Sequence, residues 1–122
     1  VKLLFKQMVD AIAYMHEKNV ANFDVSLENM LINDVDVSID EQENLKFILD
    51  DKNNPIQMKM CDLGLSEMYK NDDNGNPIWI TSKNAGKSNY KSPEMVRGDD
   101  KLNAASNDVW CLGVTLFMML IG

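Results

Sequence analysis

The 122-residue sequence has little of the chemistry on which several protein classes depend. Its two cysteines, Cys61 and Cys111, lie far apart and can form neither a disulfide framework nor a four-ligand zinc site. We therefore expect reduced thiols in an intracellular reducing compartment. Twelve basic residues stand against 19 acidic ones, and the net charge of −7 argues against the basic stripe of a nucleic-acid-binding protein and against a polybasic membrane anchor.

Histidine and long hydrophobic runs are also scarce. The single histidine, His16, has no nucleophile beside it, so we expect an exposed residue at a helix end and not a catalytic base. The most apolar run, residues 109–121, contains thirteen residues, whereas a helix needs about 20 to cross a bilayer. We expect residues 106–121 to form a buried core helix, with no membrane span in this segment.

Neither end of the chain has the features of a natural terminus. Val1 is not a methionine, follows no helix cap and opens no signal-peptide pattern. Gly122 comes directly after the most apolar segment. These features predict an excerpt of a longer protein, which we call the parent protein.

The apolar residues that are present, 45% of the chain, predict a globular fold with short elements. Residues 1–18 predict a helix because apolar side chains recur every three or four positions, at Leu4, Met8, Ile12 and Met15. Asn19 can adopt the left-handed conformation that ends a helix. Residues 30–32 and 57–61 predict short strands.

Two stretches between these elements are polar. Residues 33–54 form an acidic, asparagine-rich insertion. A calcium loop counted from Asp34 is rejected, because Ile39 and Leu45 occupy the positions that need glycine and glutamate. Residues 65–90 contain few apolar side chains and predict a long functional loop with a tight turn at Asn74-Gly75.

The candidate chemistry lies in aspartate and asparagine side chains. Asp24 and Asn29 stand five positions apart in a polar loop that precedes a predicted strand. Asp62-Leu63-Gly64 follows another predicted strand, where a carboxylate beside a flexible residue can hold a metal. The oxygen atoms of these side chains favour magnesium over zinc.

Taken in order, four motifs resemble the large lobe of a eukaryotic protein kinase. They are residues 22–29, Asp62-Leu63-Gly64, residues 86–94 and residues 108–113. The resemblance implies an α+β, protein-kinase-like large-lobe fragment, mainly helical, with short β-hairpins around the catalytic loop. It also implies that residues 1–122 are a partial kinase domain, with catalytic loop, activation segment and following core helix but without the small lobe and the C-terminal helices.

The resemblance implies a role for each matching residue. Asp24 stands where the catalytic aspartate accepts or orients the proton of the substrate hydroxyl. Asn29 and Asp62 stand where the two magnesium ligands occur, Gly64 permits the turn that aims Asp62, and Cys61 borders the nucleotide pocket. The implied cofactors are ATP and Mg²⁺, and the implied partner is a protein substrate.

Several positions depart from the family pattern. Phe23 replaces the arginine before the catalytic aspartate, so activation by a phosphate on the activation loop is not expected. Ser26 replaces a lysine near the transferred phosphate, and Lys87 replaces a threonine that lies beside that lysine in the family. Either Lys87 compensates by bringing its long, flexible side chain to the same phosphate oxygens, or it is a solvated loop residue. Asp108 is expected to cap the apolar helix and to tie the catalytic loop to it.

A narrower resemblance is to the FIKK kinases of apicomplexan parasites. It rests on residues 26–29, on Gly86-Lys87 with residues 90–94, and on residues 107–113. Members of that group are often exported into the host cell, so the resemblance leaves localisation open between an intracellular compartment and export.

The expected activity is that of an ATP-dependent protein serine/threonine kinase in the parent protein, with the fragment alone inactive. The alternative is a pseudokinase that acts as a binding or scaffold module, which the changes at Asn22, Phe23 and Ser26 favour. The presence of Asp24, Asn29 and Asp62 together favours the enzyme.

Overall fold

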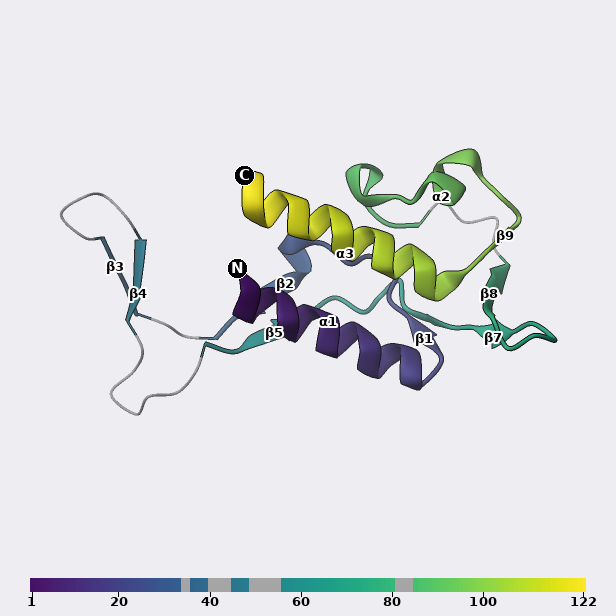
Figure 1. The fold of residues 1–122 in the computed structure, drawn as a ribbon, viewed down its shortest axis with the longest axis horizontal. Helices are drawn as coiled ribbons and strands as arrows, with labels where there is room; N and C mark the ends of the chain where they lie inside the picture. The colour runs from purple at the N-terminus through teal and green to yellow at the C-terminus, as the bar shows by residue number, and fades with distance from the viewer. Residues whose placement is uncertain (34–35, 40–44, 49–55, 81–84) are drawn as a thin grey trace.

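The structure, a computed structural model, describes residues 1–33, 36–39, 45–48, 56–80 and 85–122. In these ranges the α-helices are α1 (Lys2–Glu17), α2 (Pro93–Arg97) and α3 (Ala104–Ile121), and short 3-10 helices span Leu27–Asn29 and Ser88–Tyr90 (Figure 1). The strands are β1 (Val20–Ala21), β2 (Met30–Ile32), β3 (Asp36–Ile39), β4 (Leu45–Ile48), β5 (Met58–Met60), β6 (Glu67–Met68), β7 (Lys70–Asn71), β8 (Pro77–Ile80) and β9 (Lys101–Leu102). This mixture of helix and short strands confirms the expected α+β class.

Helices α1 and α3 run alongside each other in opposite directions and enclose the main core (Figure 1). Met8 and Ile12 of α1 are buried against the inner face of α3. The three-and-four spacing of apolar residues therefore produces the buried face, and α1 confirms the helix predicted over residues 1–18. Asn19 has a φ of 54°, which is the left-handed conformation expected at the end of this helix.

The strands form small antiparallel pairs and not one large sheet. β2 pairs with β5 so that Met30 lies opposite Met60, and β1 pairs with β6. These pairs confirm the strands predicted at residues 30–32 and 57–61. Because the two strands are antiparallel, the chain enters β2 and leaves β5 at the same end, which is the end that carries the candidate site.

The segment predicted as a long loop, residues 65–90, is paired over much of its described length. It contains β6, β7 and β8, and β7, β8 and β9 form a three-stranded sheet in which Trp79 lies opposite Leu102. The loop prediction was wrong here because strands of two to four residues are too short to show an alternating pattern of their own. The turn prediction is confirmed, since Gly75 has a φ of 82° between β7 and β8.

Only part of the acidic insertion, residues 33–54, is described. β3 and β4 pair as a hairpin that projects away from the helices, with Asp36 opposite Ile48 (Figure 1). The calcium loop counted from Asp34 and rejected on sequence grounds lies partly outside the described residues.

Helix α3 begins at Ala104, two residues earlier than predicted. Asn103 is its cap, because its side-chain oxygen accepts the backbone N–H of Ser106 at 2.8 Å. The expectation that Asp108 caps the helix was therefore wrong, since Asp108 lies one turn inside it. The buried face of α3 includes Leu112 and Thr115 and packs on the core.

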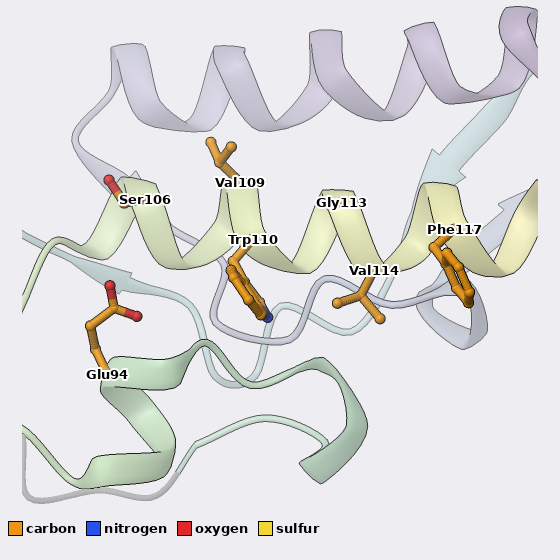
Figure 2. A pocket seen from close by; sticks show the side chains of 7 residues that line it. All are labelled: Glu94, Ser106, Val109, Trp110, Gly113, Val114 and Phe117. Atoms are coloured by element: carbon orange, nitrogen blue, oxygen red, sulfur yellow. The ribbon is translucent and has the colours of Figure 1, made fainter.

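The outer face of α3 is apolar and exposed, so the helix predicted as a buried core helix is buried on one face only. Trp110 and Phe117 are 47% and 64% exposed. With Val114 and with Glu94 of α2 they line an open hollow of about 700 Å³ (Figure 2). By length and hydropathy alone α3 is apolar enough to cross a membrane, a test that core helices also pass. Its buried polar side chains favour the core helix.

Candidate active site

The carboxylate of Asp24 is held by neighbours on several sides. Its Oδ2 accepts a hydrogen bond from the Asn29 amide at 2.8 Å, and the same amide donates to the Asp24 carbonyl at 2.9 Å. Lys87 Nζ lies 3.3 and 3.2 Å from the two carboxylate oxygens. The Asp24 backbone N–H donates to Asn22 Oδ1 at 3.0 Å. With 11% of its side chain exposed, Asp24 is fixed in place and still reachable from solvent.

Asp108 of α3 anchors the loop that carries Asp24. This fully buried carboxylate accepts the backbone N–H of Asn22 at 2.7 Å and that of Phe23 at 2.9 Å. Phe23 has a φ of 61°, which is rare for a bulky residue and which these two hydrogen bonds help to stabilise. The expectation that Asp108 ties this loop to the helix is confirmed.

His16 is not the exposed helix-end residue that its sequence context predicts. Its Nε2 lies 2.9 Å from Asp108 Oδ2, and its side chain is 18% exposed. The Tyr69 ring meets the imidazole edge-on, and the Tyr69 hydroxyl donates to the His16 carbonyl at 3.1 Å. Burial, and next the nearby Asp108 carboxylate, raise the pKa of Tyr69, so it remains a neutral donor. His16 thus supports the residue that anchors the loop bearing Asp24.

The pairing of β2 with β5 brings Asn29 beside the segment that contains Asp62. The backbone N–H of Cys61 donates to the Asn29 carbonyl at 2.9 Å, and the Cys61 thiol lies 3.4 Å from the same oxygen. Asn29 precedes β2 and Cys61 follows β5, so Asn29 and Asp62 lie at the same end of this pair. Because the amide NH₂ of Asn29 bonds to Asp24, its amide oxygen is the atom left to bind a metal.

Asp62 itself has much weaker support. It is exposed, and its Oδ1 accepts the Gly64 N–H at 3.3 Å. Its own φ is 55°, which reverses the chain at this point. A Cβ atom at Gly64 would lie 3.2 Å from Asp62 Oδ1, so the absence of a side chain leaves room for the carboxylate to turn back.

An amide oxygen and a carboxylate at one end of the β2–β5 pair fit a magnesium ion. Mg²⁺ takes oxygen ligands and usually keeps several waters, so one or two protein ligands suffice. The described part of the chain contains no group of three or more His, Cys, Asp or Glu side chains, as a zinc centre would need. The donor set at Asn29 and Asp62 therefore suits Mg²⁺ and not zinc.

Lys87 and Ser26 meet beside Asp24. Lys87 Nζ donates to Ser26 Oγ at 2.8 Å, and Ser26 is fully buried. The Lys87 side chain is 36% exposed, so its ammonium lies against the catalytic loop and is still partly in contact with solvent. The two residues are 61 positions apart in the sequence, and the fold brings them together.

Tyr90, to which the sequence pattern assigned no role, joins the segment of residues 86–94 to the loop that carries Asp24. Its hydroxyl donates to Glu28 Oε2 at 3.2 Å and accepts the Leu27 N–H at 3.4 Å. Burial raises the pKa of Tyr90, whereas hydrogen bonds, chiefly from the backbone and also from Tyr90, lower the pKa of Glu28. The sequence could have indicated the burial of Tyr90, because an aromatic side chain in a stretch with few apolar residues is usually buried.

The comparisons with known proteins agree with this geometry. The family described as "Protein kinase domain" matches residues 1–122. A probable serine/threonine-protein kinase KIN1 homolog from Enterocytozoon bieneusi (strain H348) is 30% identical over 118 residues, which are 97% of this chain and 15% of that protein. CBL-interacting protein kinase 21 from Oryza sativa subsp. japonica is 33% identical over 121 residues, which are 98% of this chain and 18% of that protein.

A third relative comes from yeast. Serine/threonine-protein kinase CHK1 of Saccharomyces cerevisiae (strain ATCC 204508 / S288c) is 29% identical over 119 residues, which are 97% of this chain and 18% of that protein. The chain spans less than a fifth of the length of these three relatives. The relatives do not show the narrower FIKK-type assignment. The family match nevertheless covers every residue, and the chain belongs to the protein kinase domain family.

Proposed function

We propose that residues 1–122 form the catalytic-loop, activation-segment and core-helix part of a protein serine/threonine kinase, with residues 33–54 as an insertion. The parent protein would transfer the γ-phosphate of ATP to serine and threonine hydroxyls of protein substrates. The observation that carries the proposal is the fixed carboxylate of Asp24, 11% exposed and bonded to Asn29. The names of the relatives, all serine/threonine or CBL-interacting protein kinases, support the same class.

In the proposed reaction, Asp24 orients the substrate hydroxyl and accepts its proton. The hydroxyl oxygen forms a bond to the γ-phosphorus as the bond from that phosphorus to the bridging oxygen of ADP breaks. The products are a phosphorylated protein and ADP, with the proton on Asp24 and then in solvent. Asn29 keeps Asp24 in one position, because its amide bonds both the side chain and the backbone of that residue.

Asn29 and Asp62 would hold Mg²⁺, which neutralises negative charge on the phosphates when it is bound. Gly64 lets the Asp62 carboxylate turn back toward the chain. Cys61 bonds to the Asn29 carbonyl and directly precedes Asp62 in the sequence, so we place it at the border of the nucleotide pocket.

The test is phosphate transfer by the parent protein. Purified protein is incubated with [γ-³²P]ATP, a Ser/Thr-containing acceptor such as casein, and either Mg²⁺ or EDTA, and the products are mapped by mass spectrometry. We expect phosphoserine and phosphothreonine that depend on Mg²⁺. Nucleotide binding without any transfer would contradict the proposal and favour a pseudokinase, an alternative that the comparisons do not support.

The FIKK-type assignment is part of the same proposal and has a separate test. The group takes its name from a Phe-Ile-Lys-Lys tetrad, which would lie in the parent sequence before Val1. Finding that tetrad, in a strand ahead of these residues, would support the assignment, and a different sequence there would contradict it.

A further inference from the structure

Lys87 occupies an unusual place for a residue of the activation segment. Its ammonium touches the catalytic loop at two residues, with 2.8 Å to Ser26 Oγ and 3.2 and 3.3 Å to the carboxylate oxygens of Asp24. The segment that carries it lies more than 60 positions later in the sequence than these partners.

The backbone before Lys87 is held against the catalytic loop. Gly86 has a φ of 77°, and a Cβ atom there would come within 2.5 Å of the Phe23 carbonyl oxygen. Only glycine fits this close approach without displacing the backbone of the residue next to Asp24.

The backbone after Lys87 is fixed as well. Tyr90 is buried, with its hydroxyl on Glu28 and its carbonyl accepting from the Cys111 thiol at 3.1 Å. The backbone on both sides of Lys87 is therefore fixed by the fold. This places the Lys87 ammonium beside Asp24 before any substrate binds.

Stability alone gives little reason for this contact. An ion pair with one side chain about one-third exposed is screened by water and contributes little to folding. The arrangement is better explained by what a cation does beside a carboxylate that handles phosphoryl transfer.

We propose that Lys87 is the cation that faces the transferred phosphoryl group, and that Ser26 steers it; this rests on the kinase function proposed above. An ammonium has three N–H donors. One donor shared by the two Asp24 oxygens and one given to Ser26 leave a third for a phosphate oxygen. The activation segment thus supplies the positive charge. The site is therefore complete only when that segment is correctly placed.

The test uses Lys87→Met in the parent protein, with Lys70→Met as the control. Lys70 is exposed on β7 and its change removes the same charge. Two quantities are measured: turnover, with kcat and KM separated, and the affinities for ADP–Mg²⁺ with and without aluminium fluoride, which mimics the phosphoryl group in transfer.

We expect Lys87→Met to lower kcat by about 10²–10³-fold, the usual loss of one preorganised donor, with KM for ATP nearly unchanged. The affinity for ADP with aluminium fluoride should fall by a similar factor, while that for ADP alone stays close to wild type. Lys70→Met should alter none of these values. Lys87→Arg should retain much of the activity, because it keeps the charge.

A second variant guards against a simple folding defect. Ser26→Lys combined with Lys87→Thr should recover much of the activity lost in Lys87→Met, because it returns the cation from the catalytic loop. Near-normal turnover in Lys87→Met, or an equal loss of affinity for ADP with and without aluminium fluoride, would overturn the assignment. A wild-type protein without phosphate transfer would instead refute the kinase function itself.

Discussion

The two acids of the site, Asp24 and Asp62, are built very differently. Asp24 is mostly buried and is bonded by Asn29, Lys87 and, through its backbone, Asn22. Asp62 is exposed, and the bond that holds its carboxylate is a long one, 3.3 Å, from the glycine two residues later. The fold therefore fixes the carboxylate of Asp24, whereas the carboxylate of Asp62 lies at a turn and is only weakly held.

This difference matches the chemistry proposed for each residue. A group that positions a hydroxyl must be aligned before the substrate arrives, because misplacement by about 1 Å can cost 10²-fold in rate. A metal ligand can be drawn into place by the ion, since a bound Mg²⁺ is often the largest local charge in such a site. The contrast therefore separates a preorganised half of the site from a half that a bound metal ion would organise.

The largest expected effect comes from breaking the preorganised half. Asp24→Asn in the parent protein should lower kcat by about 10²–10⁴-fold, because it removes the proton acceptor. The melting temperature should change little, since Asn retains one oxygen for the Asn29 amide and the lost ion pair is partly exposed. Activity above a hundredth of wild type would show that Asp24 does not have this role.

Asp62→Asn should also lower turnover strongly, but in a way that responds to the metal. The loss of one carboxylate ligand should cost several kcal/mol of charge stabilisation, or about 10²-fold in rate or more. Raising the Mg²⁺ concentration should recover part of this loss in Asp62→Asn and none of it in Asp24→Asn. The same response in both variants would contradict the proposed division of the site. Steady-state rates over a Mg²⁺ titration provide the measurement.

Gly86→Ala tests how tightly the activation segment is held against the preorganised half. The positive φ alone should cost about 1–3 kcal/mol in free energy of unfolding, and the new Cβ would also press on the Phe23 carbonyl. Gly98→Ala is the matched control, because its φ is 74° and nothing lies within 4 Å. Denaturant melts should show a loss for both variants, while turnover falls only for Gly86→Ala. Equal turnover in the two variants would mean that this contact is unimportant for catalysis.

The two cysteines provide a test with a smaller expected effect, because one thiol is buried in the core and the other lies beside Asp62. Burial raises the pKa of the Cys111 thiol to about 12, so it should resist iodoacetamide at pH 8. Cys61 is partly exposed beside the proposed nucleotide pocket, so it should react, and ATP with Mg²⁺ should slow its labelling. Labelling of Cys61 that ATP does not slow would show that its placement is wrong. Mass spectrometry of tryptic peptides distinguishes the two sites.

The Cys111 pKa also predicts a dependence of stability on pH. Between the ordinary thiol pKa near 8.5 and the folded value of about 12, the unfolded chain loses a proton that the folded chain keeps. This group therefore contributes stability at pH 8 that is lost as the pH rises toward 12. Urea unfolding at pH 8 and pH 10 should show a smaller decline in Cys111→Ala than in the wild type, and an unchanged decline would refute the raised pKa.

Features encoded over short distances could be predicted from the sequence. The helix over residues 1–18 follows from the spacing of its apolar side chains, and the turn at Gly75 from its dipeptide. The pairing of Asp24 with Asn29 lies within one loop, so their spacing already suggested a common site.

Contacts between distant segments could not be predicted in the same way. His16 reaches Asp108 across 92 positions, and nothing around either residue indicates the other. Besides its neighbour β7, β8 pairs with β9, which lies beyond α2 in the sequence, and this distant pairing of residues 77–80 was not predicted. Residues 106–121 were predicted to form a buried core helix, and the exposed face of α3 was not predicted because hydropathy records which side chains are apolar and not which of them have neighbours.

The anchoring of the catalytic loop by Asp108 also has a consequence during protein synthesis. Asp108 follows Asn22 by 86 residues. At the usual rates of translation, that separation corresponds to roughly 4 to 17 seconds in which the nascent loop has no acceptor for its two backbone N–H groups. Over the same interval the apolar face of α1 lacks its partner helix α3. A chaperone that shields α1 while the chain emerges would serve this protein well, because the loop bearing Asp24 is made early and takes its working shape late.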